Sequence, residues 1–292
     1  MRTKRSTLAG TWYPGDAPTL QRAVDALLAH AAVGAVQRPA AAIVPHAGYQ
    51  YSGAVAAAAY RLWQHAPFTR VVVLAPSHRG WFRGIAVPDF DAFETPLGVV
   101  RLDPATAELR HVPLVRIDSN PFHDEHSLEI QLPFLQRVLP QALVVPLLLG
   151  EFTPDDYGAI PIVLERVAAA QTVFVISSDF THFGWRFGYQ PFPAHDAETV
   201  RTRVRALDFG AIDPVLRADA PGFAGYVSDT GITVCGRTPI QAFLTWAGTR
   251  QLHGALLAYQ TSLDVTGDYE HVVSYAAVGF TPSADDRAPS DR

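Results

Sequence analysis

The sequence contains very little cysteine and very little lysine. Among its 292 residues there is one cysteine, Cys235, and one lysine, Lys4. A single cysteine excludes a disulfide framework and any zinc site that is built from several cysteines. A single lysine near the N-terminus excludes a Walker phosphate loop and Schiff-base catalysis, because each of these needs a lysine placed in the site.

The chain also lacks an excess of positive charge and a long apolar run. Its formal net charge is -5 and no basic run follows Lys4-Arg5, so we do not expect it to bind nucleic acid. No stretch reaches about 18 uninterrupted apolar residues, and no apolar core follows the basic residues at the N-terminus, so neither a membrane span nor a signal peptide is expected. Together with the single cysteine, these features predict a soluble, cytoplasmic protein without a membrane partner.

What the sequence does contain is an alternation of apolar runs and helical patterns. Four short runs that are apolar on both faces predict buried parallel strands, at residues 41–44, 70–75, 142–149 and 172–176. Helices are predicted at residues 17–31, 53–64, 125–138, 155–170, 196–207 and 239–248. Pro133 is expected to kink or break the helix in which it lies.

Two regions depart from this alternation. Residues 84–103 predict two strands joined by a turn. Near the C-terminus, residues 256–262 and 272–280 predict a second pair of strands around a turn at residues 266–268. These pairs are expected to add antiparallel strands to the parallel ones.

No linker divides the chain before Pro282. We therefore predict one domain over residues 1–281. Its expected fold class is α/β, a layered sandwich with a mostly parallel central sheet and additional antiparallel strands. Residues 282–292 are polar and contain proline, so a disordered C-terminal tail is expected there.

Three of the predicted strands end in the same way. Each leads into a turn with proline or serine, then a histidine and a glycine: His46 follows the first strand, His78 the second and His182 the fourth. Asp179 lies in the same turn as His182. Because the carboxyl ends of parallel strands share one edge of a sheet, where ligands of α/β proteins bind, we expect these side chains to converge.

These residue types indicate a metal site, which the cysteine can join. Neutral imidazole is the commonest side-chain metal ligand, and two or three imidazoles beside a carboxylate such as Asp179 suit iron, copper or zinc. Cys235 lies just before the predicted helix at 239–248, and a helix N-terminus lowers the pKa of a thiol. The alternative is that Cys235 is a small buried side chain with a packing role. The presence of three histidines favours Cys235 as a metal ligand over a packing role.

Eight longer segments carry a family resemblance. In chain order they are RSTLAGTWYPGD, VPHAGYQYSG, APSHRG, FETPLG, DEHSLEIQLPFLQ, SSDFTHFG, CGRTPI and VVSYAAVGF. In these segments the sequence resembles the Memo family, called AmmeMemoRadiSam system protein B in bacteria, over about residues 5–280. The resemblance implies a fold similar to class III extradiol ring-cleavage dioxygenases, which hold non-haem Fe(II) with two histidines and a glutamate and use a further histidine as acid/base.

The resemblance also implies residue roles. His46 and His78 match the two histidine ligands, Cys235 takes the position of the third ligand, and His182 matches the catalytic histidine, with Asp179 beside it. A thiolate is softer than a carboxylate but still suits Fe(II), which is the expected metal, with copper or zinc as alternatives. Because a thiolate is oxidisable, the resemblance does not by itself carry ring cleavage over to this chain.

Three further residues are weaker candidates for the pocket. Tyr49 follows the first of the three histidines and either lines the pocket or packs in the core. His126 and Glu129 belong to the motif DEHSLEIQLPFLQ, so one of them is expected to line the pocket. With His123 they share one helix face, which leaves a second metal site as an alternative. Glu125 is expected to stabilise the N-terminus of the helix predicted at residues 125–138.

Three functional hypotheses follow. The first is an oxygen-dependent oxidoreductase of dioxygenase type, in which His182 transfers a proton. The second is a non-catalytic metal- or peptide-binding module that uses the same pocket. The third is a hydrolase in which zinc activates water. Whether the ligand is a small molecule or a peptide stays open, and the family name implies a functional link to a radical SAM protein.

Overall fold

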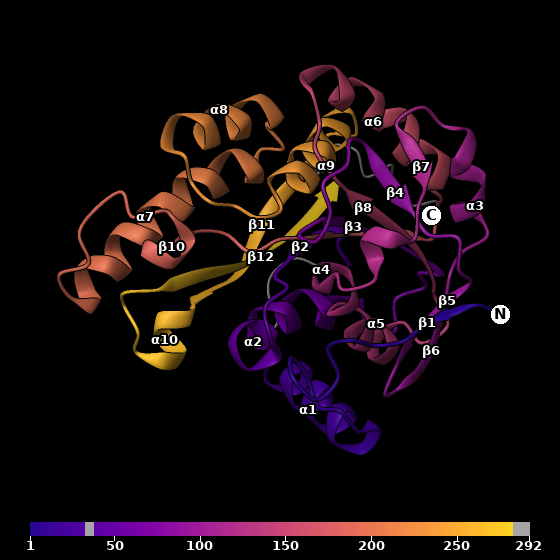
Figure 1. Cartoon of the computed structure of the whole chain (residues 1–292), viewed down its shortest axis with the longest axis horizontal. Helices are drawn as coiled ribbons and strands as arrows, with labels where there is room; N and C mark the ends of the chain where they lie inside the picture. The colour runs from indigo at the N-terminus through magenta and orange to yellow at the C-terminus, as the bar shows by residue number, and fades with distance from the viewer. Residues whose placement is uncertain (33–37, 283–292) are drawn as a thin grey trace, which may run out of the picture.

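Four strands run parallel at the centre of the main sheet. In spatial order they are β2 (Ala41–Val44), β9 (Thr172–Ser177), β3 (Arg70–Pro76) and β8 (Leu143–Leu149). The computed structural model to which they belong describes residues 1–32 and 38–282 (Figure 1). Nearly every residue of these strands is buried, because helices cover both faces of the sheet. The predicted set of buried parallel strands is confirmed.

Antiparallel strands flank this centre on both sides. On one side β12 (Val272–Pro282) pairs with β2, and β11 (Leu252–Thr261) and β10 (His182–Phe183) pair with β12. On the other side β4 (Ile85–Val87) is antiparallel to β8 and parallel to β7 (Val115–Ile117). Within the described residues these nine strands form one sheet, which is mixed as expected.

A small second sheet corrects the prediction for residues 84–103. That region contains three strands instead of two, because β4 joins the main sheet while β5 (Ala92–Thr95) and β6 (Gly98–Arg101) form a hairpin with β1 (Thr3–Lys4) at its edge. Pro88 follows β4 directly. Its missing N–H ends the ladder of β4 and separates this strand from the hairpin.

Helices cover both faces of the main sheet. One face carries α1 (Ala17–His30), α2 (Tyr49–Tyr60) and α5 (Leu132–Val138). The other face carries α6 (Pro154–Val167), α7 (Ala197–Leu216), α8 (Ala220–Thr230) and α9 (Arg237–Thr249). Successive strand residues face opposite layers, as Ile43 and Val44 do. The described chain is therefore a single α/β domain built in layers, as predicted.

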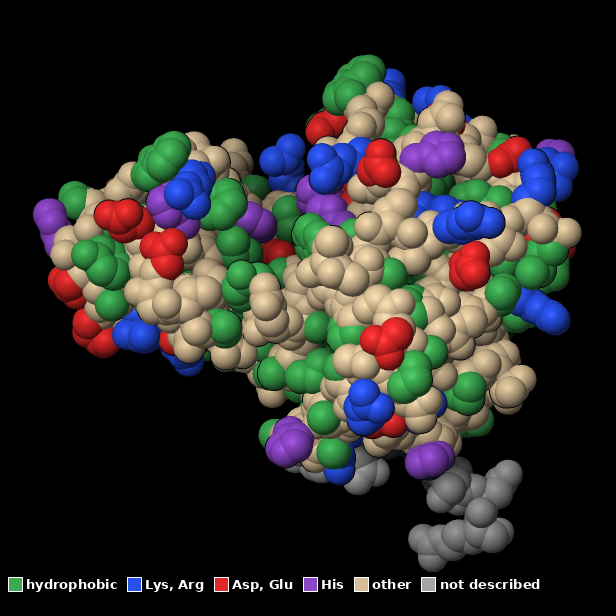
Figure 2. Space-filling view, turned by 60° about the horizontal axis from the view of Figure 1, so that its bottom comes forward, with side chains coloured by type: hydrophobic (Ala, Val, Ile, Leu, Met, Phe, Trp, Pro, Cys, Tyr) green, Lys and Arg blue, Asp and Glu red, His purple; other side chains and the backbone are tan. Residues whose placement is uncertain are grey.

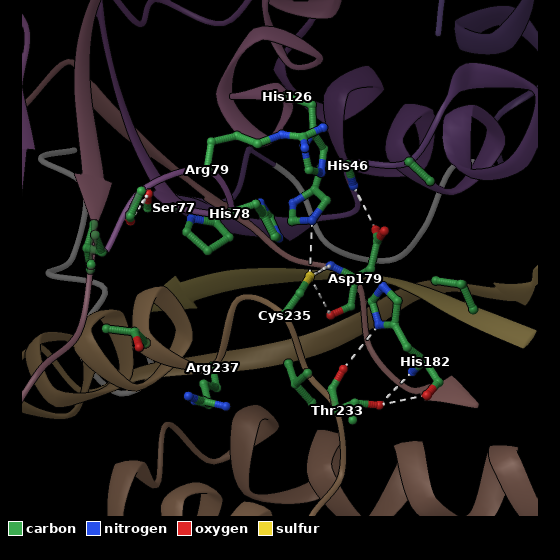
Figure 3. Close-up of a pocket in the computed structure, with 18 of the residues that line it drawn as sticks. His46, Ser77, His78, Arg79, His126, Asp179, His182, Thr233, Cys235 and Arg237 are labelled. Carbon is green, nitrogen blue, oxygen red and sulfur yellow. Dashed lines mark hydrogen bonds between the residues drawn. The ribbon is translucent and has the colours of Figure 1, made fainter. Parts of the chain in front are cut away.

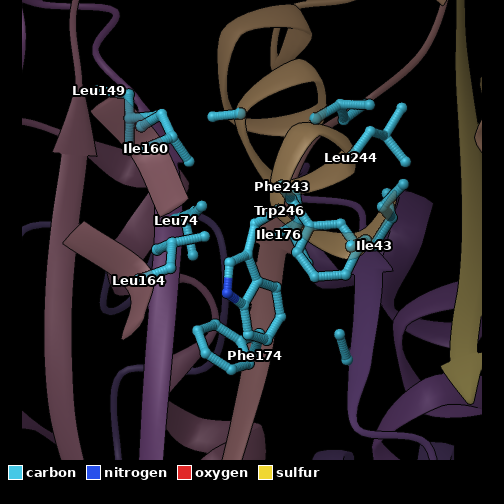
Figure 4. Packing of buried hydrophobic residues seen from close by; sticks show 14 of the residues in the cluster. Ile43, Leu74, Leu149, Ile160, Leu164, Phe174, Ile176, Phe243, Leu244 and Trp246 are labelled. Carbon is cyan, nitrogen blue, oxygen red and sulfur yellow. The ribbon is translucent and has the colours of Figure 1, made fainter. Parts of the chain in front are cut away.

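The layer that contains α9 positions one part of the candidate site. Figure 4 shows Trp246 and Phe243 of α9 packed near Phe174 and Ile176 of β9. The ring centroids of Phe174 and Trp246 lie 4.7 Å apart. Full burial of a large apolar side chain stabilises a fold by about 1.5–3 kcal/mol. This packing anchors α9, and Cys235 lies just before its N-terminal end.

Helix α2 begins at Tyr49, four residues before the predicted start at residue 53. Gly48 is its N-cap, and Gly53 lies inside the helix. A Cβ at Gly53 would lie 2.8 Å from Cδ1 of Leu27, so the glycine lets α1 approach α2 closely. The prediction was wrong because this glycine serves contact between helices and not a turn.

The predicted helix at residues 125–138 is two helices, α4 (His126–Glu129) and α5. Pro133 lies in the first turn of α5, where its missing N–H has no partner to lose, so the expected break is confirmed. The helix predicted at residues 196–207 continues to Leu216, and α8 was not predicted at all. Gly222 and Gly225 weaken the helical pattern of α8.

The remaining short elements connect the larger ones. They are α3 (Ala105–Glu108), α10 (Ser262–Thr266) and 3-10 helices at residues 61–63, 109–111, 120–122 and 185–187. Strand β12 includes Pro282, the first residue of the predicted tail, and residues 283–292 lie outside the described residues. Within residues 1–32 and 38–282, no helix is long and apolar enough to cross a membrane.

Candidate metal centre

A cavity of about 900 Å³ lies at the carboxyl ends of the parallel strands. His46 follows β2, His78 follows β3 and Asp179 follows β9, while Cys235 enters from the loop before α9. His182, at the start of β10, also lines the cavity. Figure 3 shows these side chains gathered around one space. The structure thus brings together the histidines of the three strand ends, the aspartate and the cysteine.

The ring of His46 is buried and its orientation is determined by hydrogen bonds. Nδ1 of His46 lies 2.9 Å from Oγ of Ser177, and this hydroxyl donates its only proton to the carbonyl oxygen of Ser127, 2.6 Å away. Nδ1 of His46 must therefore be the donor to Ser177, which leaves Nε2 with a lone pair. That lone pair faces Sγ of Cys235 at 3.0 Å.

The ring of His78 is oriented by a carboxylate that the sequence did not assign to the site. Glu125 accepts hydrogen bonds from the backbone N–H of His78 at 2.5 Å and from its Nδ1 at 2.9 Å. Burial is the largest single influence and would raise the pKa of Glu125, but the hydrogen bonds from His78 and the electrostatic attraction of His78 and His126 together outweigh it and lower the pKa to about 2. An ionised carboxylate behind a histidine is the usual outer partner of a metal ligand, and it leaves Nε2 of His78 free. As predicted, Glu125 also caps a helix, accepting from the N–H of Ser127.

The ring of His182 has a similar arrangement without a carboxylate. Its Nδ1 lies 3.0 Å from the carbonyl oxygen of Phe180 and 3.1 Å from that of Thr233. Carbonyl oxygens only accept, so Nδ1 carries the proton and Nε2 does not. Burial lowers the pKa of His182, which keeps the ring neutral near pH 7.

Burial dominates the chemistry of Cys235 and Asp179. It raises the pKa of the Cys235 thiol well above its usual range, and the neighbouring Asp179 raises it further. Without a nearby cation, the prediction that the helix N-terminus lowers the pKa of this thiol is therefore wrong. Burial also raises the pKa of Asp179 to about 7, although the N–H of His46 donates to its Oδ1 at 2.8 Å. A bound cation would favour the ionised form of both groups.

A glycine brings the cysteine loop close to β9. The N–H of Gly236 donates to Oγ of Ser178 at 3.0 Å. A Cβ at position 236 would lie 2.4 Å from Cβ of Ser178, so no larger residue fits this approach. The pair Cys235-Gly236 thereby places Sγ against the strand end, and the N–H of Asp179 donates to it at 3.2 Å.

Two groups of donor atoms share His46. One group consists of His46, His78 and His126, and the other of His46, Asp179 and Cys235; within each group the donor atoms lie within 4.8 Å of one another. The predicted set of His46, His78 and Cys235 is thus divided between the two groups. Imidazole nitrogen and thiolate sulfur suit iron, copper and zinc, so these residues fit a transition-metal ion.

Two of the weaker candidates lie elsewhere. Tyr49 donates to the carbonyl oxygen of Ile130 at 2.9 Å and lines a separate, mostly apolar cavity of about 710 Å³. Glu129 turns away from the metal centre and accepts a hydrogen bond from Nζ of Lys4 at 2.8 Å. It also accepts from the N–H groups of Thr7 and Leu8, so it holds the N-terminal segment in place.

The third weaker candidate, His126, does line the main cavity. Its ring lies against that of His78, with the centroids 4.4 Å apart. His123 is exposed, and among the described residues it belongs to neither donor group. Among the described residues, the side chains of residues 123, 126 and 129 therefore do not come together as one donor group.

Cations and aromatic side chains border the cavity and were not predicted. Arg79 and Arg237 line it, with Trp12 and Trp81. Trp81 is 84% exposed, whereas Trp12 packs against His126 at a tilt, with ring centroids 4.7 Å apart. Figure 2 shows histidine and arginine side chains close together around a hollow of this face. Such a rim can meet a ligand that has both anionic and aromatic parts.

Comparison with known proteins gives consistent matches along nearly the whole chain. Residues 4–279 match the family model described as "Memo-like protein". The chain is 33% identical over 290 residues to a MEMO1 family protein of Methanothermobacter thermautotrophicus, with 94% of this chain and 98% of the relative covered. It is 30% identical over 293 residues to Protein MEMO1 of Homo sapiens, with 95% and 97% covered. The identity to a MEMO1 family protein of Thermococcus onnurineus is also 30%, with 94% and 97% covered.

Proposed function

The chain belongs to the Memo family, and from this premise we propose that it is a metalloprotein with one redox-active transition-metal ion in the cavity at the strand ends. Fe(II) is the proposed metal, and copper and zinc are the alternatives. The main support for the proposal is the hydrogen bonding of the His46 and His78 rings. Each has its Nδ1 engaged by a partner, Ser177 or Glu125, and so offers Nε2 to a metal.

His46, His78 and Cys235 are the proposed ligands. The thiol of Cys235 lies 3.0 Å from Nε2 of His46, so one ion near this point can meet both atoms after the thiol loses its proton. A bound Fe(II) ion would supply a redox centre and a Lewis acid for an oxygen-bearing substrate. We propose that the protein acts as an oxygen-dependent oxidoreductase of dioxygenase type, with the layering of class III extradiol dioxygenases.

His182 is the proposed acid/base, with Asp179 beside it. The neutral ring can accept a proton from a substrate hydroxyl at Nε2. After this transfer, Nδ1–H still donates to the carbonyl oxygens of Phe180 and Thr233, which stabilise the imidazolium. Asp179, whose pKa is about 7, can hold or release a proton near neutral pH. Its Oδ1 already accepts from the backbone N–H of His46, so it also holds the loop that carries this ligand.

A second candidate function is a non-catalytic metal- or peptide-binding module that uses the same cavity. The exposed Trp81 and the two arginines of the rim favour it, because these residue types recur in binding surfaces. The ligand, whether small molecule or peptide, would meet the same histidines. The two candidates differ in whether oxygen is consumed.

Metal analysis of protein purified without oxygen tests the proposal. We expect about one ion per chain after loading with Fe(II), a sharp loss in His46→Ala and a weaker site in Cys235→Ser. His182→Ala should keep the metal and lose oxygen consumption with a catechol as probe. His123→Ala, an exposed histidine outside both donor groups, is the matched control. Equal metal content in wild type and His46→Ala would reject the site, and binding of ligands without oxygen consumption would favour the second function.

The bacterial name of the family, AmmeMemoRadiSam system protein B, supports one more element of the proposal. We propose a functional link to a radical SAM protein in the cytoplasm. Co-purification from cells that express both tagged chains, with His46→Ala as comparison, tests whether the link is physical and whether it needs the metal centre.

A further inference from the structure

We propose that His126 is an additional ligand of this metal ion, and that His46, His78 and His126 together retain the ion when the thiolate of Cys235 is lost. The inference rests on the function proposed above, because it concerns the same ion. It makes Cys235 a ligand whose loss weakens the site without emptying it. Nothing in the family resemblance assigns this role to His126.

The three rings already have the spacing of a metal-binding triangle. One ring nitrogen from each of His46, His78 and His126 lies within 4.8 Å of the other two. The rings of His46 and His126 meet edge to face at a centroid distance of 5.2 Å, and those of His46 and His78 do the same at 5.2 Å. Figure 3 shows His46 between His126 on one side and Cys235 on the other. Three imidazoles are an established donor set for zinc and also suit iron and copper.

His126 differs from the other histidines of the cavity in having an unused buried nitrogen. Nδ1 of His126 is buried and, among the described residues, has no hydrogen-bond partner. It lies 3.4 Å from Oε1 of Glu125 without forming a hydrogen bond, because that carboxylate already accepts from His78 and Ser127. A buried polar nitrogen without a hydrogen-bond partner is unfavourable. A metal ion bound at this nitrogen would take the place of the missing partner.

The ring of His126 is held by packing and not by hydrogen bonds. Trp12 covers it at a centroid distance of 4.7 Å, and His78 stacks on it at 4.4 Å. The side chain is 15% exposed, so its position is well defined without a polar partner. Trp12 belongs to the N-terminal segment that Glu129 holds, and its N–H donates to the carbonyl oxygen of Leu8. A ring that is fixed by stacking keeps its nitrogens available for a ligand.

The two donor groups differ in their resistance to oxidation. Hydrogen peroxide converts a thiolate to a sulfenic acid: sulfur bonds to one oxygen, the O–O bond breaks and hydroxide leaves. Cys235 is open to this reaction, whereas the triangle of His46, His78 and His126 contains no thiol. Oxidation at Cys235 would therefore leave three ligands in place. Two equivalents of a small thiol would then reduce the sulfenic acid, forming their disulfide and releasing the oxygen as water, which restores the fourth ligand without a new ion being loaded.

Cobalt(II) and zinc are suitable probes of this inference in the full-length chain. The decisive comparison is Cys235→Ser against Cys235→Ser with His126→Phe, because phenylalanine keeps a ring packed against Trp12 and His78 but has no donor atom. We expect Cys235→Ser to lose the thiolate-to-cobalt absorption band while still binding about one ion per chain with lower affinity. The double variant should lose the ion. His123→Ala in the Cys235→Ser background is the matched control and should keep it.

Each outcome decides between the alternatives. If Cys235→Ser already binds no ion, or if it and the double variant bind equally, the histidine triangle is not a site. Peroxide-treated wild type gives an independent test, because it should retain zinc, whereas peroxide-treated His126→Phe should release it. Circular dichroism melting shows whether His126→Phe folds, and His126→Ala replaces it where it does not. A wild-type protein that binds neither ion would reject the proposed function itself, and this inference with it.

Discussion

Two buried glutamates in one short segment serve different parts of the molecule. The side chains of Glu125 and Glu129 are 1% and 2% exposed, and both have a lowered pKa. Glu125 accepts from His78 and orients this ring at the candidate metal centre. Glu129 pairs with Lys4 and accepts from the backbone of the N-terminal segment. Burial and charge are therefore common to both residues, and only the partners tell their roles apart.

The difference comes from the local backbone. Glu125 is the N-cap of α4, with φ of -85° and ψ of 121°, so its side chain turns back toward the helix start and the end of β3. Glu129 is the last residue of α4 and has helical geometry. Two residues four apart share a face only when both are helical. One non-helical residue is enough to send the two carboxylates to different neighbours.

The largest effect is expected from Glu129→Gln. The change leaves the Lys4 ammonium, whose side chain is 8% exposed, without its counter-charge. Removing one partner of a buried ion pair typically costs about 3–5 kcal/mol, so the free energy of unfolding in urea should fall by this amount. Metal content per chain should stay as in wild type. A loss of metal without a loss of stability would contradict the separate roles of the two glutamates.

The next effect is the contribution of Glu125 to stability in acid. The pKa of Glu125 in the folded chain is about 2, below the ordinary 4.5, because the hydrogen bonds from His78 and the electrostatic attraction of His78 and His126 together outweigh burial. Its stabilisation is therefore fully present above pH 4.5 and is lost as the pH falls toward about 2, a change of about 3 kcal/mol. In Glu125→Gln this part of the pH dependence should be missing. Urea unfolding of the metal-free proteins across this pH range measures it, and parallel curves for wild type and variant would count against the assignment.

Glu125→Gln should also weaken the metal site. Glutamine cannot supply the negative charge behind His78, and loss of such an outer partner typically lowers metal affinity by about 10–100-fold. Competition with a chromophoric chelator measures the affinity. Glu129→Gln is the matched control, because it removes the same charge from the same segment. Similar affinities for the two variants would erase the distinction between the residues.

The smallest effect is expected from combining Lys4→Met with Glu129→Gln. When both charges are removed, no ion is left buried without a partner, so the double variant should be more stable than the sum of the single changes predicts. We expect a coupling of about 0.5–3 kcal/mol in a double-mutant cycle of urea unfolding. Additive changes would mean that the N-terminal segment is held by the hydrogen bonds to Thr7 and Leu8 alone.

Much of the centre could be predicted from short segments. The apolar runs that precede His46 and His78 predicted that both histidines lie at one edge of the sheet, because parallel strands align their carboxyl ends. The partners of Glu125 and Glu129 could not be predicted in this way. The motif places both on one predicted helix, and the sequence does not show that the helix begins only at His126. The motif therefore left Glu129 beside His126 as a candidate for the pocket and gave no sign of the contact between Glu125 and His78.

The sequence by itself determined the α/β alternation, the buried central strands and the placing of histidines after three of them. These features are local, because a strand, a turn and a helix cap depend on neighbouring residues. Only the tertiary structure decided that Sγ of Cys235 lies 3.0 Å from Nε2 of His46, across 189 residues of sequence. It also decided that burial raises the pKa of that thiol and that His126 joins the histidines of the centre. Such contacts depend on how distant segments pack and on the water that the packing removes, and no local pattern records either.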